Sequence, residues 1–159
     1  MGILHHRVAL ITGAGRGIGR AIALAYAHEG ATLALAARTL GELEHTAQAA
    51  QTLGATTCIV RADVSDPTQV DDMVRQTVER FATIDILVNN AGVAGPVGPL
   101  QDNDVAAWVR TIQVNLIGTY LCCRAVLPIM RQQNRGKIIN LSGAGGHHGV
   151  APALRLWRQ

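Results

Sequence analysis

The sequence predicts an α/β fold in which helices cover both faces of a doubly wound parallel sheet. Short apolar runs alternate along the chain with helix-like stretches, which is the pattern of βαβ units and hence of a parallel sheet. A glycine-rich segment lies between the first apolar run and the first helical stretch. The chain has 159 residues, of which 48% are hydrophobic, so a single domain with a sizeable core is expected.

The individual elements follow from the apolar runs and from residues that start or stop helices. Asp66 and Pro67 suit the N-cap and first position of a helix, and Gly30 suits a helix end. Pro128 is expected to bend or loosen the last turn of a long helix. The predicted strands are 8–12, 31–37, 56–61, 84–88 and 137–141, and the predicted helices are 17–29, 39 or 41 to 53, 67–81 and about 102–131.

Composition and charge exclude several classes of function. The net charge of +3 comes from scattered arginines and not from a basic stripe, so no nucleic-acid partner is expected. The three cysteines have no ligand spacing and suit a reducing compartment, which predicts a cytoplasmic protein. No apolar run reaches transmembrane length, the first residues do not form a signal peptide, and His5-His6 has no third ligand nearby. We therefore expect no membrane and no metal site.

The segment from Thr12 to Gly19 has the strand–turn–helix layout that binds a pyrophosphate. Glycines allow a tight turn and a close backbone approach to phosphates, and the N–H groups of the first helical turn face the anion. The spacing is T-G-x-x-x-G-x-G and does not fit the G-x-G-x-x-G fingerprint. A glycine-rich loop without a ligand is the alternative. The expected cofactor-binding residues here are Gly13, Gly15, Arg16, Gly17, Ile18 and Gly19.

The end of the second predicted strand indicates which dinucleotide is preferred. A carboxylate about 20 residues after the glycine turn would bind the ribose 2′-hydroxyl of NAD. Arg38 stands there instead, and Arg16 lies within the turn. Guanidinium groups suit a 2′-phosphate, so the sequence favours NADP over NAD. Two solvated surface arginines are the alternative.

A second motif, Asn89-Asn90-Ala91-Gly92, follows the fourth predicted strand, and its asparagines could tie neighbouring loops together. With T-G-x-x-x-G-x-G after the first strand, it makes the chain resemble the short-chain dehydrogenase/reductase family. The resemblance implies a Rossmann-type sheet of order 3-2-1-4-5 in a single dinucleotide-binding domain over residues 1–159. It also implies an NAD(P)-dependent oxidoreductase that transfers hydride between NADP(H) and a small carbonyl or alcohol substrate. Full-length relatives would be homo-oligomers.

The resemblance implies roles for residues beyond the glycine turn. Asp63 would hydrogen-bond the adenine, with help from the Val64 backbone. Asn90, Ala91 and Gly92 would also lie at the cofactor, where Gly92 keeps the path clear. A helix-capping aspartate is the alternative for Asp63, and a plain turn is the alternative for the asparagine motif.

Two more residues correspond to the family's catalytic positions. Asn115 lies among apolar residues of the long predicted helix, where an asparagine usually needs a buried partner. The family uses this asparagine to hold a water in a proton relay; the alternative is that it only ties down a neighbouring backbone group. Ser142 follows the fifth strand, where the family's serine hydrogen-bonds the substrate oxygen. The commoner pattern would place that serine at Gly143, so a bystander role for Ser142 is the alternative.

The chain departs from the family in its proton donor, a tyrosine in a Tyr-x-x-x-Lys motif whose lysine lowers the tyrosine pKa. Tyr26 and Tyr120 are followed four residues later by Gly30 and Arg124, and Lys137 is the only lysine. We therefore expect a chain truncated after about five strands. The alternatives to an active enzyme are a catalytically dead dinucleotide-binding fragment or a truncated pseudogene product. Its fifth strand would then form an exposed apolar edge that favours aggregation.

The last six residues, 154–159, match nothing expected in a helix of the family. One choice of codons for them, read one nucleotide later, encodes S-A-Y-G-A-S-K, which contains Tyr-x-x-x-Lys. The hypothesis is that these residues are a frame-shifted reading of the missing motif. Codon degeneracy leaves an unrelated tail as the alternative.

Overall fold

The computed structural model describes residues 2–143, so the hypothesis on residues 154–159 lies outside the described residues. Five parallel strands form one sheet in the order β3-β2-β1-β4-β5, which confirms the predicted order. The strands are β1 (Val8–Thr12), β2 (Thr32–Ala37), β3 (Thr57–Arg61), β4 (Ile86–Asn89) and β5 (Lys137–Asn140).

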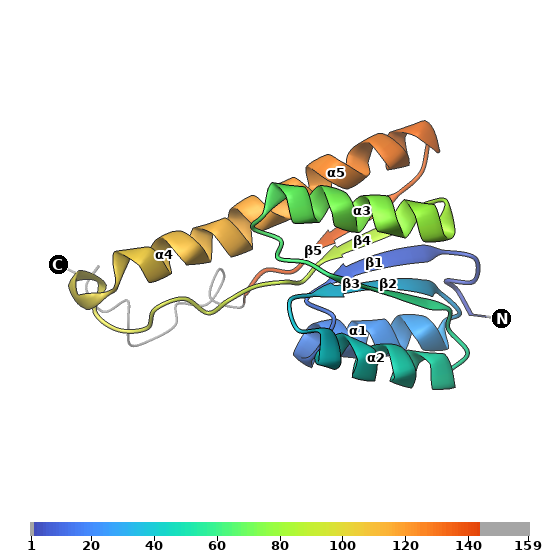
Figure 1. Ribbon diagram of the computed structural model, residues 1–159, viewed down its shortest axis with the longest axis horizontal. Helices are drawn as coiled ribbons and strands as arrows, with labels where there is room; N and C mark the ends of the chain where they lie inside the picture. The colour runs from blue at the N-terminus through green and yellow to red at the C-terminus, as the bar shows by residue number, and fades with distance from the viewer. Residues whose placement is uncertain (1, 144–159) are drawn as a thin grey trace.

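Helices cover both faces of the sheet (Figure 1). One face carries α1 (Gly17–His28) and α2 (Leu40–Thr52), and the other carries α3 (Pro67–Phe81) and α5 (Gly118–Gln132). β1 supplies both apolar cores, because successive side chains of a strand point to opposite faces. Leu10 packs in the cluster under α3 and α5, whereas Ile11 packs in the cluster under α1 and α2. All five residues of β1 are buried, as expected of a central parallel strand.

The long helix begins later than predicted. α4 (Val105–Ile112) starts at Val105, because the Asp104 carboxylate caps it by accepting hydrogen bonds from the backbone N–H groups of Ala106 and Ala107. Leu100–Asp102 forms a separate 3₁₀ turn. The prediction of a helix from about residue 102 was therefore wrong at its start. α4 extends beyond the sheet as a projecting arm (Figure 1).

The middle of the long helix is a π-helical segment, Gln113–Ile117, and α5 then continues through Pro128 to its end. By length and composition the helix Val105–Gln132 could cross a membrane, although no uninterrupted apolar run in the sequence reaches transmembrane length. A core helix of a globular protein passes the same test. Because α5 places Cys122 and Val126 fully inside the apolar core, we assign this helix to the fold.

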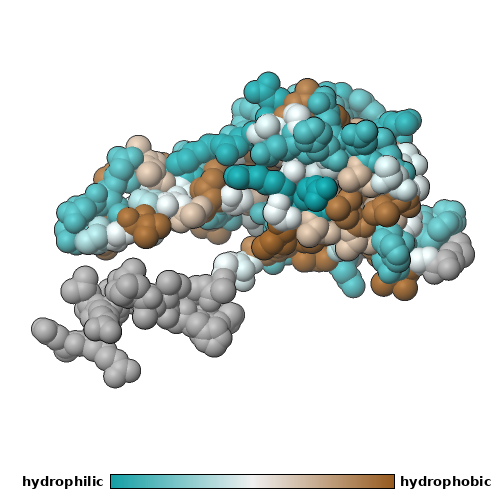
Figure 2. All heavy atoms as spheres, turned by 90° about the horizontal axis from the view of Figure 1, so that it is seen from below, coloured by the Kyte–Doolittle hydropathy of each residue, from teal (hydrophilic) through white to brown (hydrophobic). Residues whose placement is uncertain are grey.

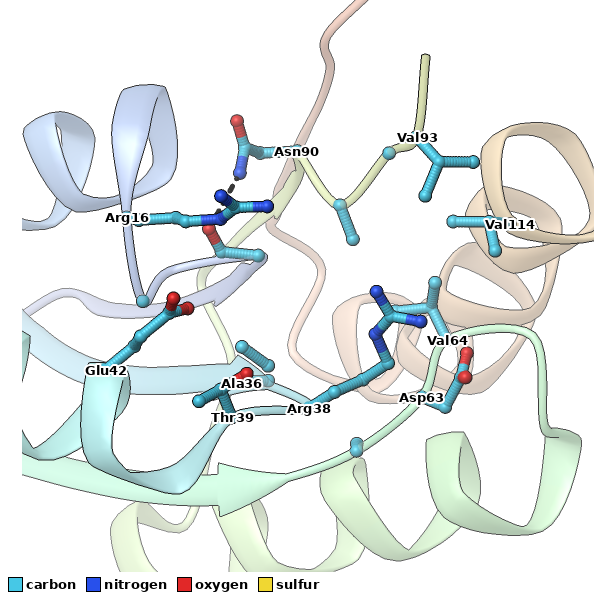
Figure 3. A pocket seen from close by; sticks show the side chains of 16 residues that line it. Arg16, Ala36, Arg38, Thr39, Glu42, Asp63, Val64, Asn90, Val93 and Val114 are labelled. Carbon is cyan, nitrogen blue, oxygen red and sulfur yellow. Dashed lines mark hydrogen bonds between the residues drawn. The ribbon is translucent and has the colours of Figure 1, made fainter. Parts of the chain in front are cut away.

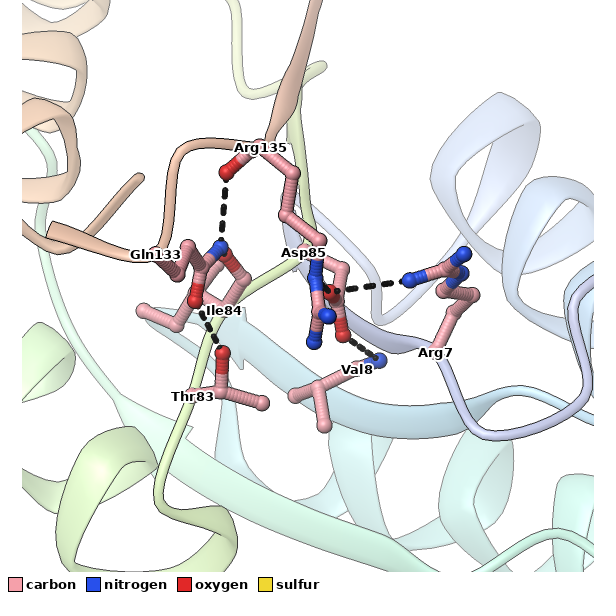
Figure 4. A network of polar contacts seen from close by, with 7 residues as sticks. All are labelled: Arg7, Val8, Thr83, Ile84, Asp85, Gln133 and Arg135. Carbon is pink, nitrogen blue, oxygen red and sulfur yellow. Dashed lines mark hydrogen bonds and ion pairs between the residues drawn. The ribbon is translucent and has the colours of Figure 1, made fainter. Parts of the chain in front are cut away.

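A buried carboxylate joins three strands at their amino-terminal ends (Figure 4). β4 begins two residues later than predicted, and Asp85, directly before it, is only 4% exposed. Its carboxylate accepts hydrogen bonds from the Val8 backbone N–H at 3.0 Å and from the side chains of Arg135 at 2.9 Å and Arg7 at 3.5 Å. Its backbone N–H donates to the Val8 carbonyl, and its carbonyl accepts from the Lys137 N–H. Asp85 therefore links β1, β4 and β5.

Replacing Asp85 by asparagine keeps the side-chain shape but removes the charge that both arginines contact. We expect Asp85→Asn to lower the free energy of unfolding by about 1–3 kcal/mol. Urea denaturation followed by circular dichroism measures this loss. Asp72→Asn is the control, because it removes an exposed ion pair with Arg75 and should leave the unfolding midpoint nearly unchanged. Equal midpoints for the wild-type chain and Asp85→Asn would contradict the role given to this carboxylate.

Candidate functional site

A cavity of about 260 Å³ lies where the turns after β1, β2, β3 and β4 meet (Figure 3). It brings together most of the predicted cofactor-binding residues, namely Gly13, Gly15, Arg16, Arg38, Asp63, Val64, Asn90, Ala91 and Gly92. Gly17, Ile18 and Gly19 do not line it and form the first turn of α1 instead. The remaining lining residues were not predicted from the sequence and are Ala36, Ala37, Thr39, Glu42, Ala62, Val93 and Val114.

The glycine spacing is explained by the close packing of the first turn. Gly13 has φ +64°, and a Cβ there would lie 2.8 Å from Asn90 Nδ2 and 2.9 Å from Ala91 Cα. A Cβ on Gly19 would collide with the Gly13 carbonyl oxygen. Gly17 has φ +54° with open space around it, so glycine is favoured there by the backbone conformation and not by close packing. Side chains at Gly13 or Gly19 would push the turn away from α1 and from the loop after β4.

The two helices that begin at the cavity have no side-chain cap. α1 begins after Arg16 and α2 after Thr39, and neither residue makes a capping hydrogen bond within the described part of the chain. In contrast, α3 and α4 are capped by the carboxylates of Asp66 and Asp104. Uncapped N–H groups and the helix dipole both favour an anion at a helix start. The cavity therefore has two helix N-termini able to receive negatively charged groups.

The Thr12 hydroxyl joins the turns after β1 and β4. It donates to the Val88 carbonyl at 3.3 Å and accepts from the backbone N–H groups of Asn90 and Ala91, both at 3.1 Å. The Asn90 side-chain amide donates to the carbonyl oxygens of Thr12 at 2.9 Å and Gly13 at 3.1 Å. The prediction that an asparagine of this motif ties neighbouring loops together is confirmed.

Four charged side chains line the cavity: Arg16, Arg38, Glu42 and Asp63 (Figure 3). Both arginines are exposed, and within residues 2–143 neither forms an ion pair. No carboxylate stands at the end of β2, but α2 brings Glu42 into the same cavity. Glu42 could not be predicted from the end of β2, because it lies on the next helix and not at the strand end. The sequence signal for its position is the spacing of Thr39 and Glu42, which is typical of a capping box and places the glutamate in the first turn of a helix.

The Asp63 carboxylate is held from two sides. One oxygen accepts from the Ser65 backbone N–H at 3.0 Å and from its hydroxyl at 2.7 Å, and the other accepts from the Arg110 guanidinium at 2.5 Å. Partial burial raises the pKa of Asp63, but the hydrogen bonds from Ser65 and Arg110 and the Arg110 charge outweigh it and hold the pKa below its usual value. The helix-capping alternative for Asp63 was wrong, because Asp66 caps α3.

The two residues matched to catalytic positions lie outside the cavity lining. Asn115 is in the π-helical segment, where its side chain accepts from the Val93 N–H and donates to the Val93 carbonyl, both at 2.9 Å. It is exposed, and its side chain ties down the backbone at Val93, while its role in a proton relay stays a prediction. Ser142 is exposed just beyond β5 and makes no side-chain hydrogen bond to other described residues. Within the described residues, Tyr26 and Tyr120 also lie outside this lining.

None of the three cysteines lines this cavity. Cys58, Cys122 and Cys123 are free thiols, and burial raises the pKa of Cys122 to about 12. Only Cys122 is fully buried, while the other two are half-buried. Over residues 2–143, no group of three His, Cys, Asp or Glu side chains could hold a metal ion.

The sheet order, the glycine-rich turn after β1 and the cavity at the carboxyl ends of the strands define a Rossmann-type fold. Residues 7–153 match the family model described as short chain dehydrogenase. The chain belongs to the short-chain dehydrogenase/reductase family.

The relatives include enzymes with different cofactors. Levodione reductase of Leifsonia aquatica is 40% identical over 146 residues, which cover 91% of this chain and 55% of that protein. A solved NAD⁺-bound xylitol dehydrogenase is 33% identical with a TM-score of 0.90, covering 92% of this chain and 56% of that one. A metagenomic short-chain oxidoreductase in complex with NADP is 36% identical with a TM-score of 0.87. The match covers 93% of this chain and 67% of that one. The chain spans about half the length of the curated relatives it matches.

The Thr12 hydroxyl offers a direct test of how the cavity is held together. Thr12→Val keeps the shape but leaves two backbone N–H groups without an acceptor, so we expect a loss of about 1–3 kcal/mol in the free energy of unfolding. Thr12→Ser keeps the hydroxyl and serves as the control. Urea denaturation of the three chains measures the difference. Equal losses for the valine and serine variants would show that methyl packing, not hydrogen bonding, matters at this position.

Proposed function

We propose that this chain binds NADP(H) as an oxidoreductase that acts on a small carbonyl or alcohol compound. The observation that carries the proposal is the pair of guanidinium groups, Arg16 and Arg38, beside two uncapped helix starts. A phosphate monoester is the ligand group that such a donor set fits best. The absence of an acid at the end of β2 supports the same choice.

The residues present fit such a dinucleotide. The glycine turn from Gly13 to Gly19 and the start of α1 would receive the pyrophosphate, since Gly13 and Gly15 line the cavity and α1 begins there without a side-chain cap from the described residues. Arg16, Arg38 and the start of α2 would hold the 2′-phosphate. Asp63 and the Val64 backbone would meet the adenine, and Asn90, Ala91 and Gly92 would lie toward the nicotinamide side. Asp63 is suited to accept from an amino group, because its depressed pKa keeps it ionised at neutral pH.

The bound cofactor would supply or accept the hydride. Asn115 holds the loop after β4 against the long helix, and Ser142 would hydrogen-bond the substrate oxygen. Neither described tyrosine lines the cavity, so a dinucleotide-binding chain without turnover is the second candidate. Binding and turnover are therefore measured separately. The free thiols agree with a reducing, cytoplasmic location.

Replacing Arg38 by alanine tests the cofactor preference. We expect Arg38→Ala to weaken NADPH binding by about 1.5–3 kcal/mol, because one charge-assisted contact is lost. NADH binding should change little, since NADH lacks the 2′-phosphate. Isothermal titration calorimetry with each cofactor measures both effects. Arg20→Ala is the control, because Arg20 is exposed on α1 and does not line this cavity. Equal losses for NADPH and NADH would refute the preference.

The long helix supports a further part of the proposal, namely self-association through its exposed apolar face. Large apolar side chains recur at helical spacing along it and remain open to solvent, and Figure 2 shows apolar surface on the projecting arm. An apolar stripe of this length is uncommon on a monomer. A second copy of the chain is the occupant we propose. The exposed residues are Val105, Trp108, Val109, Ile112, Leu116, Ile117, Tyr120 and Leu127.

An arginine placed in this stripe should disrupt the association. Leu116 is 61% exposed, so Leu116→Arg costs little in the folded monomer but brings a charge into the proposed contact. We expect at least a roughly tenfold weaker association constant in sedimentation equilibrium. Leu53→Arg, at an exposed leucine that ends α2, is the matched control. An unchanged association constant for Leu116→Arg would place the contact elsewhere.

A further inference from the structure

Packing places a carboxylate of α2, Glu42, against the glycine-rich turn. A Cβ built on Gly15 would lie 2.8 Å from Glu42 Cβ and 3.1 Å from Glu42 Oε2. The Thr46 hydroxyl is fully buried and lies 3.1 Å from both the Gly15 and the Glu42 carbonyl oxygens. The start of α2 is therefore held to the turn, and the absence of a side chain at Gly15 leaves room for the carboxylate.

The Glu42 side chain does not cap its own helix. In a capping box, the glutamate would accept from the Thr39 N–H, and the Thr39 hydroxyl would cap the helix start. The described residues 2–143 show neither hydrogen bond, although the spacing of the two residues allows both. The carboxylate lies instead on the Arg16 side of the cavity, while the Arg38 guanidinium lies on the Asp63 and Val64 side (Figure 3).

Glu42 differs from the other acid of the cavity in that its carboxylate has no ion-pair partner among the described residues. The charge of Asp63 is balanced by Arg110. Among residues 2–143, no ion pair involves Glu42, Arg16 or Arg38. A ligand entering the cavity thus meets two unbalanced positive charges and one unbalanced negative charge.

We propose that Glu42 sets the ratio of the affinities for NADP(H) and NAD(H), an inference that rests on the function proposed above. Its charge opposes the 2′-phosphate that Arg16 and Arg38 attract. For a cofactor without that phosphate, the same carboxylate accepts a hydrogen bond from a ribose hydroxyl. An acid at the end of β2 would otherwise supply this acceptor. The cavity therefore prefers NADP(H) but also binds NAD(H).

Two substitutions at Glu42 separate its charge from its hydrogen-bond acceptor. Glu42→Gln removes the charge and keeps an acceptor, so we expect about three- to tenfold tighter NADPH binding and an NADH affinity within about twofold of wild type. Glu42→Ala removes both, so NADPH again binds more tightly while NADH binds about threefold more weakly. Glu44→Gln, exposed on the same helix and outside the cavity lining, is the control and should change neither affinity.

Isothermal titration calorimetry with NADPH and NADH on the full wild-type chain and the three variants gives the eight affinities needed, and circular dichroism verifies that each variant is folded. Raising the salt concentration should reduce the gain of Glu42→Gln, because the effect is electrostatic. An unchanged NADPH affinity in Glu42→Gln, or equal changes for both cofactors, would overturn this inference while leaving NADPH binding by the wild-type chain intact. A wild-type chain that binds neither cofactor would overturn the proposed function, and this inference with it.

Discussion

The complete burial of β1 is the constraint on which the rest of the structure depends. Both faces of this strand pack in apolar cores, so polar contacts are made at its two ends. At the amino end, the Asp85 carboxylate accepts hydrogen bonds from the Val8 N–H and from two arginine side chains. At the carboxyl end, Thr12 and Asn90 join the turns after β1 and β4. These contacts fix the position of the glycine-rich turn, and with it the shape of the cavity.

Features set by local chemistry could be predicted from the sequence. The helix opened by Asp66 and Pro67 spans the predicted residues, because an N-cap carboxylate followed by proline leaves one starting point. The strand order came from the family resemblance and not from the spacing alone. The start of the long helix was predicted too early, because Asp102 belongs to a separate 3₁₀ turn and the Asp104 carboxylate caps the helix.

Features that depend on contacts between distant segments could not be predicted. Arg110 reaches Asp63 across 47 positions of the chain, and nothing near either residue indicates the pair. Glu42 enters the cavity because Thr46 fastens α2 to Gly15, which lies 31 positions earlier. The sequence around Glu42 alone predicts that its side chain caps the start of its own helix. The charged groups of the cavity were therefore predicted as two arginines and Asp63, whereas packing adds Glu42 as a second carboxylate.

The polar groups of the cavity region fall into two sets according to whether they have an internal partner. Asp63, Asn90 and Thr12 are engaged by other described residues, so they maintain the shape of the site. Arg16 and Glu42 form no ion pair within residues 2–143, and the starts of α1 and α2 have no side-chain cap there. Leaving such groups without internal partners costs stability unless water or a ligand satisfies them. Their concentration around one cavity is therefore the physical reason to assign ligand binding to this end of the sheet.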